Sequence, residues 1–329
     1  MQMRSRAGFR YVFIVAALAV MNVSLPASEE AAVRAAEPQQ VRHLPGQIVP
    51  APGKGAWLAY NRDADRDGRL DPFFMCGPGG PEGFLFGDIV AGDTPDTVLD
   101  KMIEHGGNCL YMMGIRSHGG DGKPTHNPFI DHDPAKGLDP KVLDRWEQWF
   151  QRMEAHGIVI YFFLFDDSVR IWKGDEIAPA ERRYLRGIVD RFEHHPNLIW
   201  CVAEEYSEAL SPTKVRKAAA EIRDADDHDH VIATHQHGGQ TLFDFADDAD
   251  QEQFAMQIGG TSPADVHAAC LEAWHRARGR YNVVMSELLH HGELLTAGDR
   301  DGVRKVIWAA AVAGNYVMHL GTWETDRNR

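Results

Sequence analysis

Short apolar runs alternate with longer amphipathic stretches from about residue 84 to the end of the chain. Each buried strand of a parallel sheet is covered by the helix that follows it, so this alternation predicts βα units. The runs predicted as strands are residues 84–86, 108–112, 158–165, 198–203, 231–234, 254–258, 282–285 and 316–320. Eight such units favour a (β/α)8 TIM barrel, with an open doubly wound sheet as the alternative.

Amphipathic segments between these runs have the periodicity of helices. Apolar residues recur at i, i+3 and i+4 in residues 140–156, and Pro179 and Pro212 stand in the first turns of later segments. The predicted helices are residues 95–105, 140–156, 179–194, 212–225, 263–278 and 301–313. Only a weak segment, residues 241–245, separates the fifth and sixth strands, and the chain ends before an eighth helix becomes visible.

Composition limits the class of partner. The 329 residues are 44% hydrophobic and 25% charged, which is enough for one sizeable core. The net charge of −14 excludes binding of a nucleic acid backbone by bulk electrostatics. A neutral substrate such as a sugar is compatible with this charge.

The N-terminus has the pattern of an export signal. Arg4, Arg6 and Arg10 precede the apolar run of residues 11–20, and small residues follow it. We predict a signal peptide over residues 1–27, a linker over residues 28–55 and a secreted or periplasmic protein without stable membrane insertion after signal removal. A retained membrane anchor is the alternative.

A loop rich in aspartate precedes the predicted barrel, within a segment spanning residues 56–83. Asp63, Asp65 and Asp67 alternate, Gly68 follows, and Asp71 is in the position of a closing ligand. Ca²⁺ prefers 6–8 oxygen ligands, and a glycine lets the chain turn around the ion. The pattern predicts a structural Ca²⁺ site, with a solvated acidic turn as the alternative. The barrel is predicted over residues 84–329.

Polar residues follow most of the predicted strands. In a (β/α)-barrel the C-terminal ends of the strands form one rim, where active sites lie. The residues that we predict to meet there are His118, Asp166, Glu204, Glu205, Tyr206, His235, Gln257, Glu287 and Trp323. Glycoside cleavage needs one acid to protonate the leaving oxygen and one carboxylate to attack or to activate water, and the fourth and seventh strands supply such a pair.

Two of these segments resemble a known family. Residues 197–206, NLIWCVAEEY, resemble the fourth-strand segment of clan A glycoside hydrolases, in which an Asn-Glu pair ends the strand. Residues 282–287, NVVMSE, resemble the seventh-strand segment, which a Glu closes. The resemblance implies that Glu205 is the general acid/base and Glu287 the nucleophile of a retaining glycosidase that needs no cofactor for catalysis.

Further parts of the chain resemble the same clan. Residues 84–88, FLFGD, resemble the strand-one segment of cellulase-like barrels, and Trp323 falls where the clan carries a platform tryptophan. The clan's asparagine is replaced here by Glu204, so either Glu204 or Glu205 could be the acid. The implied partner is a poly- or oligosaccharide, and the remaining rim residues are implied to bind it.

Two other functions stay open at this point. The barrel could be a non-catalytic module that binds carbohydrate or matrix. It could also be a metal-dependent hydrolase, because two histidines separated by one residue at a strand end can ligate Zn²⁺. The residues of that metal centre would be His235, His237, His290, His291, Asp166 and Asp167.

Overall fold

The computed structural model describes residues 42–78, 83–89, 93–259, 262–288 and 299–319. They belong to the second of two compact units, Val41–Arg329, and the description concerns this unit alone. The predicted signal peptide and Trp323 lie outside the described residues. In the part of the chain that is described, no helix has the length and apolarity needed to cross a membrane.

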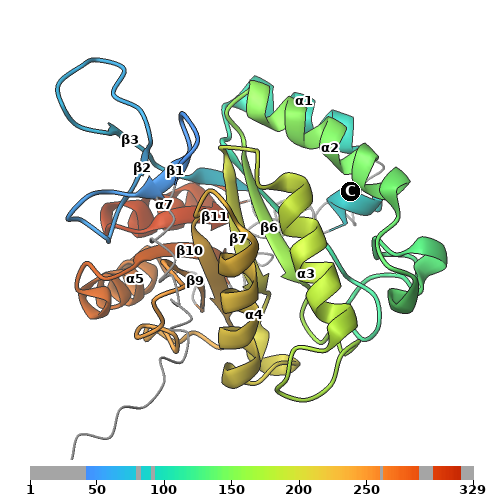
Figure 1. Cartoon of the computed structure of the whole chain (residues 1–329). Helices are drawn as coiled ribbons and strands as arrows, with labels where there is room; N and C mark the ends of the chain where they lie inside the picture. Colours follow the sequence, from blue (N-terminus) through green and yellow to red (C-terminus); the bar gives the residue numbers. More distant parts are fainter. Residues whose placement is uncertain (1–41, 79–82, 90–92, 260–261, 289–298, 320–329) are drawn as a thin grey trace, which may run out of the picture. The chain divides into compact units, whose positions relative to one another are not determined.

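Among the described residues, eight strands form a barrel-like sheet whose neighbouring strands pair in parallel. In chain order they are β4 (Cys76–Pro78), β5 (Cys109–Met113), β6 (Val159–Phe165), β7 (Leu198–Ala203), β8 (Ile232–Gln236), β9 (Gln253–Ile258), β10 (Asn282–Leu288) and β11 (Tyr316–His319). Neighbours in sequence are neighbours in the sheet from β5 to β11, and β4 pairs with β11. The arrangement is consistent with the predicted (β/α)8 barrel (Figure 1).

The two edge strands of this sheet, β4 and β5, approach each other and close the barrel. The backbone N–H of Asn108, which precedes β5, donates to the carbonyl of Cys76 at 2.9 Å. The side-chain oxygen of Asn108 accepts from the N–H of Cys76 at 2.7 Å. Gly77 lies so close to β5 that a Cβ atom there would stand 2.1 Å from the carbonyl oxygen of Cys109. A glycine is therefore required where the two strands approach.

The prediction of a first strand at residues 84–86 is wrong. Phe84–Phe86 forms a short 3-10 helix, η1, which ends at Gly87 with a left-handed φ of 68°. The first strand is instead Cys76–Pro78, which the backbone register with β11 places in the sheet. Phe84 and Leu85 are fully buried, so their apolar character reflects packing against the outside of the barrel.

The remaining elements follow the predicted order. The helices are α1 (Pro95–His105), α2 (Pro140–Ala155), α3 (Pro179–Phe192), α4 (Pro212–Ala225), α5 (Pro263–Ala277) and α7 (Arg300–Val312). Short 3-10 helices are η3 (Ile130–His132), η4 (Pro134–Lys136) and η5 (Tyr206–Glu208). Proline at the first turn, which suits the helical φ and needs no N–H partner, begins α1 to α5. Residues 241–245 form bends and turns, not a helix.

Alternate residues of each strand face opposite sides of the sheet, as strand geometry requires. Tyr111, Tyr161 and Phe163 belong to a cluster inside the barrel, whereas Leu110, Phe162 and other neighbours pack outward against the helices. The barrel is therefore filled with side chains, and its working surface is confined to its ends.

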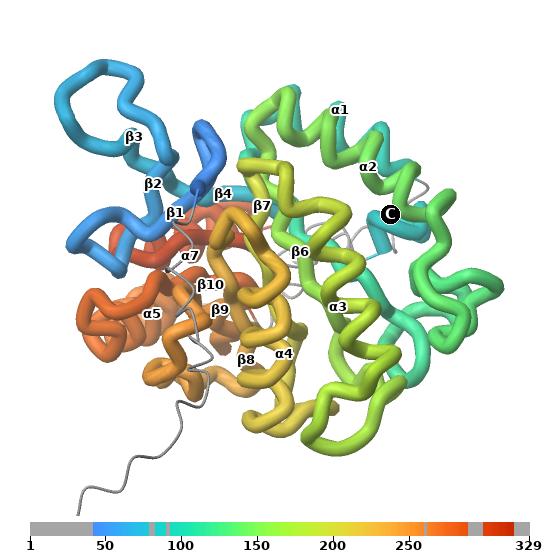
Figure 2. The backbone as a smooth tube through the Cα atoms, viewed as in Figure 1, coloured from blue at the N-terminus to red at the C-terminus, as the bar shows by residue number. Residues whose placement is uncertain are grey.

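A three-stranded antiparallel sheet lies across one of these ends. It consists of β1 (Ile48–Pro50), β2 (Leu58–Tyr60) and β3 (Asp71–Pro72), which we call the floor sheet. Its contacts go to residues at or before the strand starts: Ile48 N–H donates to Pro196 O at 3.0 Å, and Asn282 donates to Ala56 O at 2.8 Å. The floor sheet thus contacts the N-terminal ends of the strands, and Figure 2 traces its chain in blue.

Candidate active site

Glu204 and Glu205 follow β7 directly, and their side chains reach different places. Glu204 is 5% exposed, and its Oε1 accepts a hydrogen bond from the hydroxyl of Tyr111 on β5. Glu205 has a left-handed backbone with φ of 35°, which is uncommon for a residue other than glycine. Its N–H donates to Nδ1 of His235 at 3.1 Å, which helps to hold this conformation.

Glu287 is directed into the barrel mouth by an irregularity in β10. Met285 pairs with Met256, but the next pair is Glu287 with Gln257, so Ser286 is an extra residue. Val284 faces the inside of the barrel and Met285 the outside. Simple alternation would therefore bring Ser286 inward and Glu287 outward. The bulge reverses this and places Glu287 beside Gln257.

Gln257 connects the two carboxylates. Its Nε2 donates to Oε1 of Glu205 and, at 2.8 Å, to Oε2 of Glu287. Its Oε1 accepts from the backbone N–H of Gly238 at 2.9 Å, which orients the amide with its nitrogen toward the carboxylates. Because one nitrogen bridges them, the nearest oxygens of Glu205 and Glu287 are at most two hydrogen-bond lengths apart, about 6 Å.

His235 is a fully buried neutral ring beside this pair. Its Nδ1 accepts from the N–H of Glu205, so a single ring proton belongs on Nε2, which lies 3.8 Å from Oε2 of Glu287. Burial, with a smaller contribution from His237, lowers the pKa of His235 to about 3. The ring therefore presents an N–H to Glu287 without adding a positive charge.

The pKa of Glu205 is raised, and the causes have opposite signs. Burial contributes most, because it penalises the charged form, and the side chain of Glu208 raises the pKa further. His237, whose Nδ1 lies 2.8 Å from Oε2 of Glu205, lowers it. A raised pKa keeps a proton on this carboxyl closer to neutrality, which suits an acid catalyst.

A second group of acids lies behind Glu204. Asp166 is 2% exposed, and its Oδ2 accepts from Arg116 at 3.2 Å and from the N–H of Asp121 at 3.0 Å. Burial raises the pKa of Asp167 to about 7, with Asp166 as the next cause. Oxygens of Asp166, Asp167 and Glu204 lie within 4.8 Å of one another. The mouth is thus acidic on its β6–β7 side.

Not every predicted residue reaches the carboxylate pair. His118 is exposed, with a φ of 65°, and its Nδ1 contacts its neighbour Ser117 at 2.6 Å. Tyr206 is 4% exposed, its ring packs on Phe245 at 5.0 Å between centroids, and its hydroxyl binds Asp244. Such burial does not fit the predicted contact of Tyr206 with a sugar.

The predicted histidine metal centre is divided in the structure. His235 shares one group of possible ligand atoms with Glu204 and Glu287, whereas His237 shares another with Glu205 and Glu208. His290 and His291 lie outside the described residues. Among the described residues, His235 and His237 therefore do not converge on one ion, and Asp166 and Asp167 belong to a third group.

The Asp-rich loop brings part of its predicted ligand set together. Oxygens of Asp63, Asp65 and Asp71 lie within 4.8 Å of one another, and Gly68 has the positive φ of 83° expected at the turn. Asp67 lies outside this group, and Arg62 binds Asp71 at 2.8 Å. Calcium binding by the loop stays a prediction.

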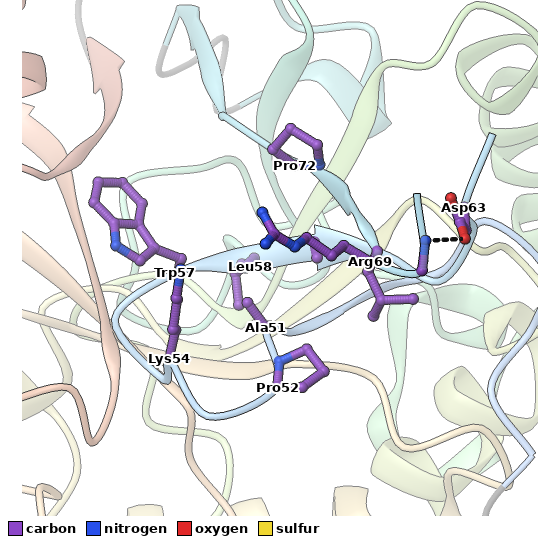
Figure 3. Close-up of a pocket in the computed structure, with 11 residues that line it drawn as sticks. Ala51, Pro52, Lys54, Trp57, Leu58, Asp63, Arg69 and Pro72 are labelled. Atoms are coloured by element: carbon purple, nitrogen blue, oxygen red, sulfur yellow. Dashed lines mark hydrogen bonds between the residues drawn. The ribbon is translucent and has the colours of Figure 1, made fainter. Parts of the chain in front are cut away.

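A pocket of about 870 Å³ lies beside this loop, far in the chain from the strand-end acids. Trp57, Lys54 and Arg69 are among its lining residues, and Asp63 accepts from Gly68 N–H at its edge (Figure 3). It includes none of the residues that follow the barrel strands. We therefore place the candidate active site at the opposite, C-terminal rim.

Sequence reasoning missed contributors that the fold supplies. Tyr111 stands inside an apolar strand run and gave no polar signal, although it binds Glu204. Glu208 falls on η5, one turn after Glu205, and its proximity depends on the local backbone. The sequence pattern indicates His237 only as a possible metal ligand, whereas in the structure it pairs with Glu205.

Comparisons with known proteins agree with this architecture. The sequence model described as "Apiosidase-like, catalytic domain" matches residues 70–321. No curated protein sequence matches the chain. The resemblance to clan A glycoside hydrolases expected from the sequence is confirmed by this match and by the solved structures.

Three similar solved structures are hydrolases of this kind. A proposed glycoside hydrolase from Bacteroides vulgatus shares 17% identity over 84% of this chain and 55% of its own, with a TM-score of 0.62. A family 5 glycoside hydrolase from the same species shares 16% sequence identity over 86% of this chain and 64% of its own, with a TM-score of 0.58. The β-mannanase of the blue mussel Mytilus edulis shares 13% sequence identity over 86% of this chain and 95% of its own, with a TM-score of 0.57.

These likenesses concern the fold alone, because the identities are low. The chain also spans only 55–65% of the length of the first three solved structures that it matches.

Proposed function

This chain belongs to the family of apiosidase-like catalytic domains, and from that premise we propose that it is a glycosidase that cleaves O-glycosidic bonds with retention of configuration. The observation that carries the proposal is the pair Glu205 and Glu287, joined through the single amide nitrogen of Gln257. Their nearest oxygens are at most about 6 Å apart, a proximity that supports the ~5–5.5 Å carboxyl separation of retaining enzymes over the ~6.5–9.5 Å of inverting ones.

In the proposed mechanism Glu287 attacks the anomeric carbon while the bond to the leaving oxygen breaks. Glu205 gives its proton to that oxygen, and a covalent ester between sugar and Glu287 results. Glu205, now ionised, takes a proton from water as the water attacks the same carbon and releases Glu287. The raised pKa of Glu205 supports the first step, and the neutral His235 beside Glu287 avoids an ion pair that would weaken the nucleophile.

Glu204 is proposed to bind a sugar hydroxyl rather than to act as the acid. Its Oε1 is held by Tyr111, and its carboxyl lies deeper than that of Glu205, among Asp166 and Asp167. The bridge from Gln257 reaches Glu205 and Glu287, which gives this pair the shared geometry that the mechanism needs. The family description makes a glycoside of apiose the first substrate to test.

Activity on a panel of aryl glycosides, including an apioside, a mannoside and a glucoside, tests the proposal. Glu287→Gln should lower kcat by at least about 10³-fold, and Glu205→Gln by about 10²–10⁴-fold. Glu104→Gln, which changes an exposed carboxylate on α1, is the matched control and should leave the rate unchanged. A parent protein that turns over no glycoside contradicts the catalytic proposal and favours a binding module.

Leaving-group dependence separates Glu205 from Glu204. A dinitrophenyl glycoside needs no protonation of its leaving oxygen, so Glu205→Gln should retain most of its glycosylation rate with this substrate and little with a poor leaving group. Glu204→Gln should affect both substrates alike. The reverse pattern would assign the acid to Glu204. Retention itself is read from the anomer that NMR detects first.

A metal-dependent hydrolase is the second candidate, since ligand atoms of Glu204, His235 and Glu287 lie within 4.8 Å of one another. A chelator should then abolish turnover, and Zn²⁺ should restore it. The glycosidase proposal expects no effect of the chelator on the rate.

Export by the predicted signal peptide is a further proposal, which N-terminal sequencing of the mature protein tests.

A further inference from the structure

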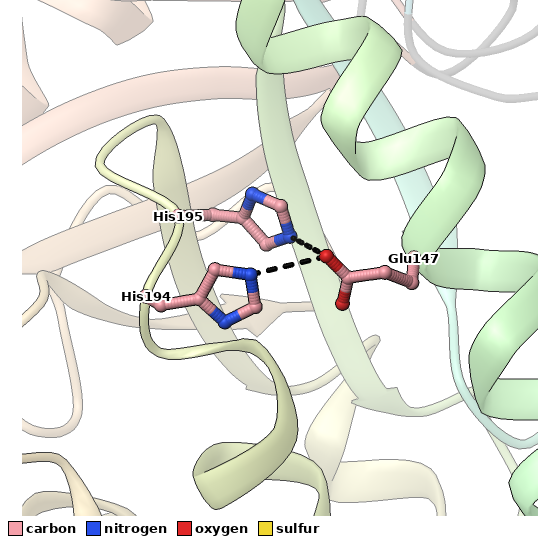
Figure 4. Close-up of side chains that lie close together, drawn as sticks. All are labelled: Glu147, His194 and His195. Carbon is pink, nitrogen blue, oxygen red and sulfur yellow. Dashed lines mark hydrogen bonds and ion pairs between the residues drawn. The ribbon is translucent and has the colours of Figure 1, made fainter.

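A cluster of histidine and glutamate lies at the opposite end of the barrel from the candidate active site. Glu147 belongs to α2, and His194 and His195 follow α3, just before β7 (Figure 4). The carbonyl of Pro196, the next residue, accepts from Ile48 of the floor sheet. The cluster therefore belongs to the N-terminal side and takes no part in the proposed glycosidase chemistry.

The three side chains converge within the dimensions of a metal site. Nε2 of His194 lies 3.1 Å and Nε2 of His195 3.4 Å from Oε1 of Glu147, and the possible ligand atoms all fall within 4.8 Å of one another. Four ligands at ~2.0–2.1 Å around a tetrahedral Zn²⁺ stand about 3.3 Å apart. The donors thus need little movement to surround one ion.

His195 supplies the independent observation. Its side chain is fully buried, and its Nδ1 lies 2.7 Å from Oε2 of Glu154, which can only accept, so Nδ1 carries the proton. In the neutral ring Nε2 is then a bare lone pair directed at a carboxylate oxygen. Within the described part of the chain, neither this Nε2 nor Oε2 of Glu147 has a hydrogen-bond partner.

Nε2 of His195 faces Oε1 of Glu147 at 3.4 Å, and this oxygen already accepts from Nε2 of Gln151 at 2.9 Å, so the buried lone pair left unsatisfied is that of His195. A bound metal ion would accept this lone pair together with one from the carboxylate of Glu147. Glu154 then takes the place of the carboxylate that commonly orients a metal-binding histidine.

We propose that Glu147, His194 and His195 bind a divalent transition-metal ion of the Zn²⁺ class that fastens α2 to the segment between α3 and β7. Imidazole and carboxylate donors suit this class of ion. His194 is 51% exposed on its side chain, so it offers a path for the ion and leaves room for water as a fourth ligand. Arg191 is near Glu147, at 3.7 Å from Oε2, and it also pairs with Asp144 at 3.0 Å.

Zinc content and affinity of the purified chain, freed of any histidine tag and stripped with a chelator, test this proposal. The parent should take up one Zn²⁺ per chain, show the visible absorption of tetrahedral cobalt when Co²⁺ replaces zinc, and melt at a higher temperature with zinc than without. Absence of saturable Zn²⁺ binding by the folded parent overturns the proposal.

Variants locate the ion. His194→Ala should fold, because the ring is half exposed, and should lose the stoichiometric zinc and the cobalt absorption. His156→Ala, an exposed histidine just after α2, is the matched control and should bind as the parent does. Glu154→Gln should weaken zinc binding by about 10–100-fold. Zinc uptake by His194→Ala equal to that of the parent would place the ion elsewhere and contradict the site.

Discussion

Glu205 has two ionisable neighbours that act on its carboxyl in opposite directions. Burial is the largest cause of its raised pKa, Glu208 adds to the rise, and His237 opposes it. Both neighbours are more exposed than Glu205 itself, with side-chain exposures of 33% for Glu208 and 49% for His237. Each can therefore be changed with little effect on the fold.

Changing these neighbours should move the basic limb of the pH–rate profile in opposite directions. That limb reports loss of the proton from the acid catalyst. Glu208→Gln removes a cause that raises the pKa of Glu205, so the limb should move to lower pH. His237→Gln removes a cause that lowers the pKa, so the limb should move to higher pH. Profiles of kcat/KM from pH 4 to pH 9 measure both.

Movement of the basic limb in the same direction and by the same amount in both variants would mean that neither neighbour acts through Glu205. Ser207→Ala, an exposed residue between Glu205 and Glu208, serves as the control and should leave both limbs in place. No shift in either variant, with activity retained, would point to Glu204 as the titrating acid.

Single residues of the site could be predicted where position along a strand decides their direction. Glu205 and Glu287 follow predicted strands, and the C-terminal rim gathers whatever polar residues end them. The bridging role of Gln257 depends on the hydrogen bond from Gly238, and the contact of Tyr111 depends on the register between β5 and β7 across β6. Neither of these interactions can be inferred from a single sequence.

Among the helices and strands, those with a strong hydrophobic periodicity were predicted well, whereas the short first strand of the barrel was not. The helices with proline at their first turn begin where the sequence indicates, and α1 and α4 match to both ends. β4 contains a glycine and a proline, which disfavour strands by local propensity, and it exists because β11 and β5 offer it partners. The apolar run at Phe84–Phe86 was predicted as the first strand instead.

Gly77 should be essential to this closure of the barrel. Gly77→Ala would place a Cβ against the backbone carbonyl of Cys109, which cannot rotate away, so we expect a loss of at least about 2–3 kcal/mol in the free energy of unfolding. Gly259→Ala is the control, since among the described residues no atom other than those of its chain neighbours lies within 4 Å of its added Cβ. Urea unfolding measures both, and a neutral Gly77→Ala would contradict the close approach of β4 and β5.

The Asp-rich loop makes a separate prediction. Calcium added alone should raise the melting temperature of the chain by a few degrees, because an ion bound only by the folded form stabilises it. Asp65→Asn should remove this response, and Glu104→Gln should keep it. A parent whose melting temperature ignores millimolar calcium would leave the loop as the solvated acidic turn.

At the scale of the whole described unit, the floor sheet and the active rim occupy opposite ends of the barrel. Tyr316, the first residue of β11, joins the two parts: its hydroxyl accepts from Leu58 N–H at 2.9 Å and donates to Phe73 O at 2.6 Å. Both partners are in or beside the floor sheet. Stability and activity should therefore be separable through this residue.

Tyr316→Phe should lower the free energy of unfolding by about 1–3 kcal/mol, because a buried N–H and a carbonyl lose their partner. The kcat/KM of the folded variant should equal that of the parent. Tyr60→Phe, also in the floor sheet, is the control, since its hydroxyl makes no hydrogen bond among the described residues. A fall in kcat/KM without a fall in stability would show that the two ends communicate.

The extra residue in β10 has a consequence for how mutations and relatives should be compared. Because of Ser286, the inward-facing Val284 and Glu287 are three positions apart in sequence, whereas simple alternation would make them two apart. An in-frame deletion of the Ser286 codon would restore simple alternation, with Met285 outward and the glutamate still inward beside Gln257. If a relative lacks the extra residue, an alignment without a gap at Ser286 would pair Glu287 with an outward-facing position of that relative. The length of this segment therefore carries as much information as the identity of the residue that ends it.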